Sequence, residues 1–194
     1  MPNFDELLPL VRARLGNVRE GHRFRHTMGV VDTAASLAKI WGADVEKARI
    51  AALLHDATKH DDPDVQRQAV AARFGEEALK AWPRQLLHGL SAVVFAEKEC
   101  GITDPEILLA IQNHSVGRPA MTLLEKIIFA ADYLEPGRGP DPQGLRVLAA
   151  KDLDKTVARI VRDTLGHVAK TGLEIAPLSL ETEKYYDRYL EDSE

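Results

Sequence analysis

The sequence predicts an all-α protein, a bundle of helices in a single domain. Apolar residues recur at the three- and four-residue spacing of an amphipathic helix, and no segment alternates as a half-buried strand does. Helix-capping residues divide the chain at regular intervals, and neither an internal repeat nor a linker interrupts it. A chain of 194 residues is long enough to bury a sizeable core, so we expect residues 1–194 to fold as one unit.

Each expected helix in the first part of the chain is marked by a capping residue, a proline or a glycine. An oxygen-bearing N-cap side chain accepts a free backbone N–H, and glycine tolerates the left-handed conformation that ends many helices. Pro9 lies inside the first apolar stripe, where proline is unfavourable. In order, the segments are a helix capped by Asn3 and Glu6 and ended by Gly16, one over about 21–41 ended by Gly42, one that begins at Asp44 and carries His55 and Asp56 at its end, and a short one that follows the turn 61–64 and runs to Phe74.

The same signals continue through the second part of the chain. A proline at the first helical position fits its fixed φ, and a threonine followed three residues later by glutamate forms a capping box. In order, the segments are a helix over about 86–100 ended by Gly101, one opened by Asp104 and Pro105 that reaches His114, one opened by Thr122 and Glu125 that carries Asp132, a loop over 135–140, a helix reopened by Asp141 and Pro142, and two more helices that end near Gly172 and Leu190.

Composition and charge exclude several classes of function. The formal net charge is −5, whereas a protein that binds a nucleic-acid backbone normally carries a basic stripe, so we expect no nucleic-acid partner. No apolar stretch approaches the ~20 residues that span a bilayer, and no basic segment precedes an apolar one at the N-terminus. The single cysteine, Cys100, excludes an intrachain disulfide and is typical of a reducing compartment. We therefore expect a cytoplasmic protein with no membrane partner.

The adjacent pair His55 and Asp56 is the strongest functional signal, because it follows the apolar run 48–54 at the end of an expected helix. A buried imidazole and carboxylate lose hydration, and a bound metal ion compensates that loss. Further histidines and aspartates stand in similar apolar contexts, 18 to 33 residues apart, so that different helices can point them at one centre. The candidate ligands are His26, His55, Asp56, His88, His114 and Asp132.

Four histidines and two aspartates exceed what one ordinary ion needs. They suit two divalent ions, with Asp56 able to bridge them through its two carboxylate oxygens, and mixed imidazole and carboxylate ligation favours iron, manganese or zinc. A structural interpretation stays open for each histidine, since a lone histidine is more often a helix cap or a surface residue. His22, His60 and His167 lie among polar or loop-like residues, and we leave these three out of the ligand set.

The candidate ligands and their surroundings resemble the metal-binding signature of the HD-domain phosphohydrolases, and more narrowly the YqeK family of symmetrical bis(5′-nucleosyl)-tetraphosphatases. The HD signature alone is shared by many activities, whereas the two extra histidines and the stretch after Asp132 are more specific. Leu90 and Val116 depart from the family pattern, and neither is a candidate ligand. The resembling segments are 23–27 (RFRHT), 51–59 (AALLHDATK), 87–89 (LHG), 113–118 (NHSVGR) and 124–138 (LEKIIFAADYLEPGR).

This resemblance implies an HD-domain helical bundle, with a metal-binding core over about 20–140 and C-terminal helices over about 141–192 packed on it. It implies an acid-anhydride hydrolase that uses a metal-activated hydroxide to cleave diadenosine tetraphosphate symmetrically into two ADP. The implied ions are iron. The implied ligands are His26, His55, Asp56 and Asp132 for one ion, and Asp56, His88 and His114 for the other.

Basic residues near the candidate ligands are the expected contacts of a polyphosphate. If the helix continues past His55, Lys59 shares a face with that ligand, so it can contact a phosphate oxygen or assist the leaving group. Arg118 and Arg138 stand in glycine-containing loops just after ligands, where a guanidinium can bind phosphate through two hydrogen bonds, and Arg23 is a weaker candidate. A solvated helix face is the alternative for each. We expect catalysis to depend on Asp56 and Lys59.

Three alternative functions stay open. One is another HD phosphohydrolase that acts on a nucleotide, a deoxynucleoside triphosphate or a cyclic dinucleotide. Another is a redox enzyme with a di-iron site, although basic residues beside the ligands favour phosphate. The third is a non-catalytic nucleotide-binding module, although all six ligands are present. Trp41 and Trp82 are the aromatic candidates for contact with a base, and a homodimer is left open.

Overall fold

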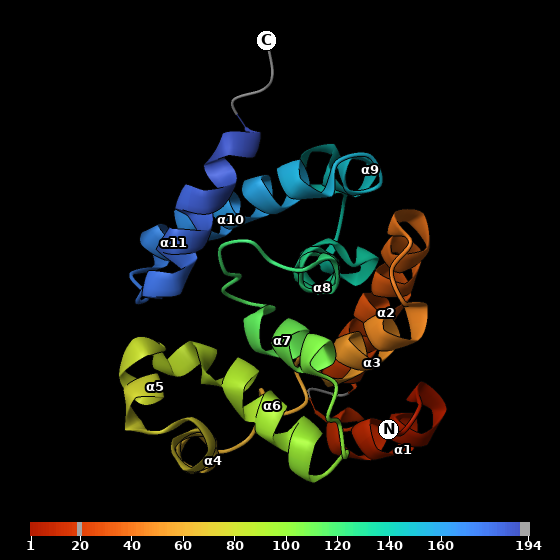
Figure 1. Ribbon diagram of the computed structural model, residues 1–194, viewed down its shortest axis with the longest axis vertical. Coiled ribbons are helices and arrows are strands. Elements are labelled where there is room, and N and C mark those ends of the chain that lie inside the picture. The colour runs from red at the N-terminus through yellow and green to blue at the C-terminus, as the bar shows by residue number, and fades with distance from the viewer. Residues whose placement is uncertain (19–20, 191–194) are drawn as a thin grey trace.

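The computed structural model describes residues 1–18 and 21–190, and no strand occurs among them, so the all-α prediction is confirmed (Figure 1). Residues 191 and 192, the end of the expected C-terminal region, lie outside this description. The α-helices are α1 (Phe4–Leu15), α2 (His22–Trp41), α3 (Val45–Leu54), α4 (Pro63–Phe74), α5 (Glu76–Ala81), α6 (Leu87–Lys98), α7 (Pro105–Asn113), α8 (Leu123–Leu134), α9 (Leu145–Ala149), α10 (Leu153–Thr171) and α11 (Pro177–Tyr186). Short 3-10 turns are η1 (Arg84–Leu86), η2 (Pro136–Arg138), η3 (Pro142–Gly144) and η4 (Asp187–Tyr189).

The predicted caps explain where the helices begin. Asn3 and Glu6 form the expected capping box at α1, in which each side chain accepts a backbone N–H of the other's residue. Thr122 and Glu125 repeat that arrangement at α8. Asp104 accepts from the backbone N–H groups of the first turn of α7, and Pro105 occupies the position where no donor is needed. These caps fix the residue at which each helix begins, and thereby the face of the helix on which a later residue such as Asp132 lies.

The structure differs from the expected elements at two places. Helix α5 and the turn η1 lie between Gly75 and α6, where the sequence suggested no element, and α5 has no buried residue that would mark it by periodicity. Asp141 and Pro142 open only the turn η3 ahead of the short α9, because Gln143 adopts a left-handed φ of 55° that ends the regular helix. Pro9, by contrast, is accommodated within α1.

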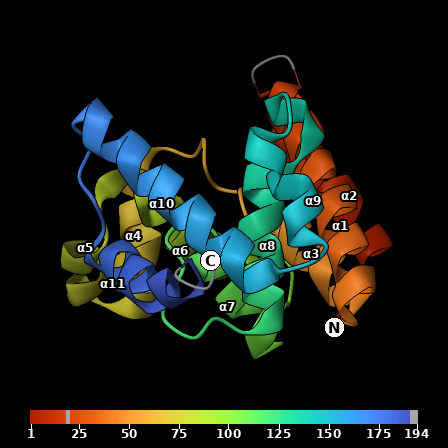
Figure 2. The same ribbon diagram turned by 90° about the horizontal axis from the view of Figure 1, so that it is seen from above.

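Helix α8 lies in the middle of the molecule. It packs against α2 and α3 on one side, α7 on another, and α10 and α9 on a third (Figures 1 and 2). Its sequence is apolar around most of its circumference, and eight of its residues are buried. A polar residue on such a helix is held at the centre of the bundle, which is the position of Asp132.

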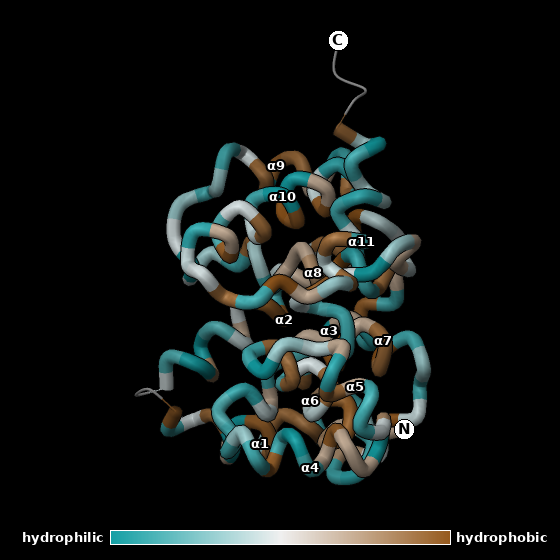
Figure 3. The backbone as a smooth tube through the Cα atoms, turned by 90° about the vertical axis from the view of Figure 1, so that its left-hand side faces the viewer, coloured by the Kyte–Doolittle hydropathy of each residue, from teal (hydrophilic) through white to brown (hydrophobic). Residues whose placement is uncertain are grey.

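One apolar cluster joins buried residues of α1–α3 and α6–α10 with Tyr186 of α11, and hydrophobic segments of the trace lie inside the molecule (Figure 3). A small second cluster of Val70, Leu87 and Leu90 lies beneath α4–α6. The continuous main cluster agrees with a single domain, whose boundaries remain a prediction. Within the part of the chain that the structure describes, no helix is long and apolar enough to cross a membrane.

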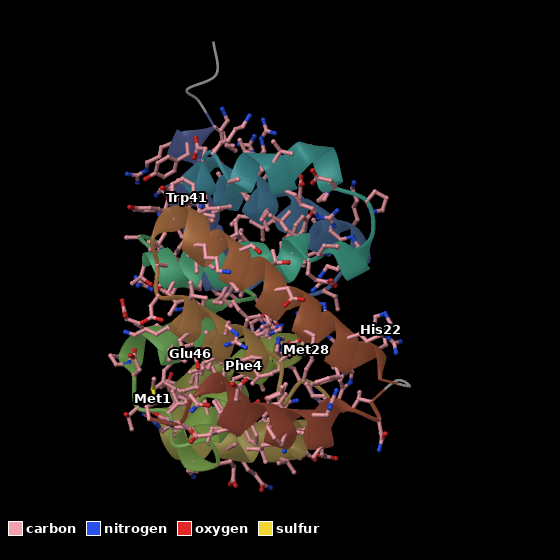
Figure 4. All side chains as sticks on the ribbon, turned by 90° about the vertical axis from the view of Figure 1, so that its right-hand side faces the viewer. Met1, Phe4, His22, Met28, Trp41 and Glu46 are labelled. Carbon is pink, nitrogen blue, oxygen red and sulfur yellow. The ribbon has the colours of Figure 1, made fainter. Side chains whose placement is uncertain are left out.

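Helix α2 crosses one face of the molecule diagonally, from His22 at one end, past Met28, to Trp41 at the other (Figure 4). The indole N–H of Trp41 donates to the carbonyl oxygen of Ala149 at 2.8 Å, so this tryptophan fastens α9 to α2. Trp82 packs against the small apolar cluster. Both tryptophans therefore have packing partners in the fold.

Candidate metal centre

The six predicted ligands come from five separate helices or their ends and meet at one point inside the bundle. All are buried except Asp132, whose side chain is 16% exposed. Five of them lie within a helix or at its C-cap, and these helices pack against one another, which brings together positions 106 residues apart. They are His26 on α2, His55 at the C-cap of α3, Asp56 directly after it, His88 in the first turn of α6, His114 at the C-cap of α7, and Asp132 on α8.

The carboxylate of Asp56 lies between two groups of histidines. Its Oδ2 is 3.6 Å from Nε2 of His55 and 3.9 Å from Nε2 of His26. Its Oδ1 is 3.4 Å from Nε2 of His88 and 3.5 Å from Nε2 of His114. The two oxygens of one carboxylate thus face two different sets of imidazole nitrogens, which is the arrangement of a bridging ligand.

Asp132 completes the first of these groups. Its Oδ1 lies 3.1 Å from Nε2 of His26 and 3.7 Å from Nε2 of His55. Ligand atoms of His26, His55 and Asp132 lie within 4.8 Å of one another, and so do those of His55, Asp56 and His114. Nε2 of His26, Nε2 of His55 and Oδ1 of Asp56 are buried and have no hydrogen-bond partner among the residues that the structure describes. Because such atoms are costly to bury unpaired, their convergence fits divalent cations with nitrogen and oxygen ligands.

Local backbone geometry fixes the tautomer of three of the histidines. Nδ1 of His55 lies 2.6 Å from the carbonyl oxygen three residues earlier, and the corresponding distances are 3.1 Å for His88 and 2.7 Å for His114. A carbonyl oxygen only accepts, so each Nδ1 carries the proton and each Nε2 presents its lone pair to the centre. This bond is available because the carbonyls near a helix end have no partner within the helix.

His26 needs a different partner, because it lies inside α2, where the preceding carbonyls belong to the helix. Its Nδ1 lies 3.0 Å from Oε1 of Glu135, a buried residue at the C-cap of α8. Oε2 of Glu135 accepts the backbone N–H of Gly137 at 2.6 Å. The carboxylate passes close to Gly29, where a Cβ atom would stand 2.4 Å from Oε2. Glu135 and Gly29 therefore position the ring of His26.

Two of the imidazoles, those of His55 and His88, are held neutral beside ionised carboxylates. Burial lowers the pKa of His55 to about 4, and burial together with the charge of Lys59 lowers that of His88 to about 3. Burial acts to raise the pKa of Asp56 and of Asp132, but the surrounding histidines and cations outweigh it, and both pKa values lie well below the ordinary value. Neutral imidazole and ionised carboxylate are the forms that bind a metal.

Three of the predicted basic residues surround the centre. Nζ of Lys59 is 3.2 Å from Oδ1 of Asp56, and Nη1 of Arg23 is 2.7 Å from its Oδ2. Nη2 of Arg138 is 2.5 Å from Oδ1 of Asp132, and its Nε donates to the Asp132 carbonyl oxygen. Lys59 and Arg138 are partly exposed, so a bound anion can reach them from solvent.

Arg118 is placed differently from the other three. Its guanidinium makes two hydrogen bonds with the carboxylate of Glu125, at 2.7 and 2.6 Å, and a third with the carbonyl oxygen of Pro119. Burial acts to raise the pKa of Glu125, yet Arg118, Thr122 and Asn113 hold that pKa below its usual value. Arg118 therefore stabilises the first turn of α8 through Glu125, and we assign it no contact with the substrate.

A cavity of about 450 Å³ opens onto the centre. His88, His114 and Asp132 line it together with Lys59 and Arg138. His167, which the sequence analysis left out of the ligand set, also lines this cavity from α10, where it is exposed. A larger cavity of about 840 Å³ is lined by α2 and α9 with Glu135 and contains none of the six ligands, so it is not the entrance to the centre.

Sequence reasoning missed two residues that the structure places at the centre. Glu135 falls within the resembling segment 124–138, three residues after Asp132, and this spacing was its available signal. The hydroxyl of Ser115 lies 2.8 Å from Nε2 of His114 and 3.2 Å from Nε2 of His88. Nothing in the sequence distinguishes this serine from an ordinary loop residue. His22 and His60 are exposed outside the ligand set, as expected.

A family model of the HD domain matches residues 23–137. This range contains all six residues of the centre and more than half of the chain, and the protein therefore belongs to the HD-domain family.

Two similar proteins indicate which branch of the HD-domain family this chain belongs to. The chain is 37% identical over 181 residues to the symmetrical bis(5′-nucleosyl)-tetraphosphatase of Halalkalibacterium halodurans, with 93% of this chain and 95% of that protein covered. It is 36% identical over 176 residues to the protein of the same name from Bacillus subtilis, with 90% and 92% covered. Within the HD-domain family, the chain thus belongs to the family of symmetrical bis(5′-nucleosyl)-tetraphosphatases, and the resemblance read from the sequence is confirmed.

The fold agrees with that of a solved relative. The crystal structure of a predicted HD superfamily hydrolase involved in NAD metabolism from Clostridium acetobutylicum matches with a TM-score of 0.86 at 36% identity, and the match covers 97% of this chain and 98% of the other. The HD-domain helical bundle is therefore shared over nearly the whole chain.

Proposed function

We propose that this protein is a metal-dependent hydrolase that cleaves diadenosine tetraphosphate symmetrically, with water, into two ADP. The relatives that share more than a third of its residues carry this activity in their names. The observation that carries the proposal is the Asp56 carboxylate, whose two oxygens face separate sets of histidine nitrogens. A paired centre of this kind suits reactions at phosphorus.

Two divalent ions are the proposed cofactors. His26, His55, Asp56 and Asp132 would hold one, and Asp56, His88 and His114 would hold the other. Bound divalent ions lower the pKa of a water and neutralise phosphoryl oxygens. The donor set of imidazoles and carboxylates suits iron, manganese or zinc, and the family resemblance favours iron among the three.

The residues of the chain provide the remaining charge. Lys59 is partly exposed beside Asp56 and lines the cavity, so its ammonium would contact a phosphate near the cleaved bond and stabilise the leaving ADP. Arg138 lines the same cavity and would contact a phosphate farther along the chain. The side chain of Arg23 is 14% exposed and donates to the Asp56 carboxylate, so we propose that it positions this carboxylate. A contact between Arg23 and the substrate stays a prediction. A cytoplasmic location and a homodimer also remain predictions.

Product analysis with the metal-loaded protein tests the proposal. Chromatography after incubation with diadenosine tetraphosphate should show two ADP for each substrate consumed. Formation of ATP with AMP would contradict symmetrical cleavage, and turnover only of cyclic dinucleotides or nucleoside triphosphates would assign the protein to another HD phosphohydrolase activity.

The ligand assignment is tested by Asp56→Ala. Because Asp56 faces both sets of histidines, its removal should abolish turnover and reduce the bound metal, measured by elemental analysis, from two ions to one or none. Full metal content with full activity would contradict the bridging role. Oxygen consumption without cleavage of the phosphoanhydride by the wild-type protein would instead support a redox enzyme.

A further inference from the structure

A second cavity, of about 340 Å³, lies beside the one that opens onto the metal centre. The two cavities share the lining residues Lys59, Gln85 and His88, so they flank the same edge of the centre. Both are within the size range of small-molecule sites. Two adjoining spaces that meet at a candidate metal ligand match a substrate with two equal halves joined at the bond to be cleaved.

Each of the two cavities has an arginine of its own in its lining. Arg138 belongs to the first cavity, and Arg84 belongs to the second. Lys59, on the shared edge, lies between them. A dinucleoside tetraphosphate carries negative charge along its whole chain, and the outer phosphates on both sides of the cleaved bond need cationic partners beyond the metal centre.

The other polar residues of the second cavity are already engaged. Asp61 forms an ion pair with Arg14, and the side-chain amide of Gln66 donates to the carbonyl oxygens of Thr58 and Asp61. Arg84 is exposed in η1, and among the residues described by the structure it has no hydrogen-bond or ion-pair partner. Its guanidinium is therefore available to a ligand without breaking any contact of the fold.

Building on the proposed function, we infer that the second cavity binds one nucleoside diphosphate half of the substrate, with Arg84 as the contact to its phosphates. The other half occupies the cavity of about 450 Å³ that Arg138 lines. With one half of the substrate in each cavity, the middle of the phosphate chain lies over Lys59 and His88, next to the metal centre. This placement would explain why cleavage gives two equal products.

The test compares a two-nucleoside ligand with a one-nucleoside ligand. Calorimetry on the metal-loaded protein would measure the affinity for diadenosine tetraphosphate with a methylene group in place of the central bridging oxygen, and for ADP. Arg84→Ala should weaken binding of the methylene analogue about tenfold, since it removes a charge-assisted contact. It should leave the affinity for ADP in the cavity beside Arg138 within about twofold.

Arg67→Ala is the matched control, because Arg67 is an exposed arginine of the neighbouring α4 that lines neither cavity. It should change neither affinity. The inference is overturned if Arg84→Ala leaves the methylene analogue within twofold of wild type, or if it weakens ADP as much as the analogue. Failure of the proposed function is seen separately, in the wild-type protein, as the absence of ADP from diadenosine tetraphosphate.

Discussion

Replacing Glu135 by glutamine should weaken metal binding although this residue contacts no metal ligand atom that faces the centre. Oε1 of Glu135 accepts from Nδ1 of His26 at 3.0 Å, and Oε2 accepts the N–H of Gly137 at 2.6 Å. A glutamine side chain has only one oxygen, so it cannot accept both hydrogen bonds. If its NH₂ group faces His26, the ring must carry its proton on Nε2, and that nitrogen can no longer bind a cation.

The expected loss is a tenfold to hundredfold weaker affinity for the ion at His26, about 1.4 to 2.7 kcal/mol, which is the usual contribution of a carboxylate behind a histidine ligand. Titration of metal-free protein against a chromophoric chelator would measure it. Glu181→Gln, at an exposed position of α11, is the control. The reasoning is refuted if Glu135→Gln binds both ions within twofold of wild type while its thermal unfolding is unchanged.

Three further predictions address the same framework. Gly29→Ala should lower metal affinity in the same assay, since its Cβ would stand 2.4 Å from a carboxylate oxygen, whereas Gly166→Ala, with open space on α10, should be neutral or stabilising by up to about 1 kcal/mol. Arg118→Ala should lower the unfolding free energy by about 1.5–3 kcal/mol in urea near neutral pH without raising KM. Because the folded-state pKa of Glu125 is depressed, the stabilisation is present above the ordinary carboxyl pKa and should shrink as the pH falls. A raised KM with normal stability would favour phosphate binding by Arg118 instead. Tyr186→Phe removes the acceptor for a buried backbone N–H at 3.1 Å and should cost about 1–3 kcal/mol in unfolding free energy, and an unchanged value would show that the hydrogen bond is dispensable.

The sequence by itself determined the helices and the identity of the centre. Caps such as Asn3 with Glu6 act within one turn, so their residue types are sufficient to predict a helix start. His55 and Asp56 were recognisable because a charged pair after an apolar run has few structural uses. Two places departed from the expected helices. Helix α5 has no buried face and therefore no periodic signal, and Asp141 with Pro142 opens only the turn η3 because Gln143 is left-handed.

Only the tertiary structure decided how these groups face one another. The contact between His26 and Glu135 spans 109 residues and exists because α8 packs against α2. The pairing of Arg118 with Glu125 likewise depends on how the turn between α7 and α8 folds, and a phosphate contact by Arg118 stays a prediction. The availability of Arg84 depends on which neighbours it lacks, and that cannot be read from residue types. Spacing along the chain sets local geometry, whereas the direction of each carboxylate oxygen depends on helix packing between distant segments.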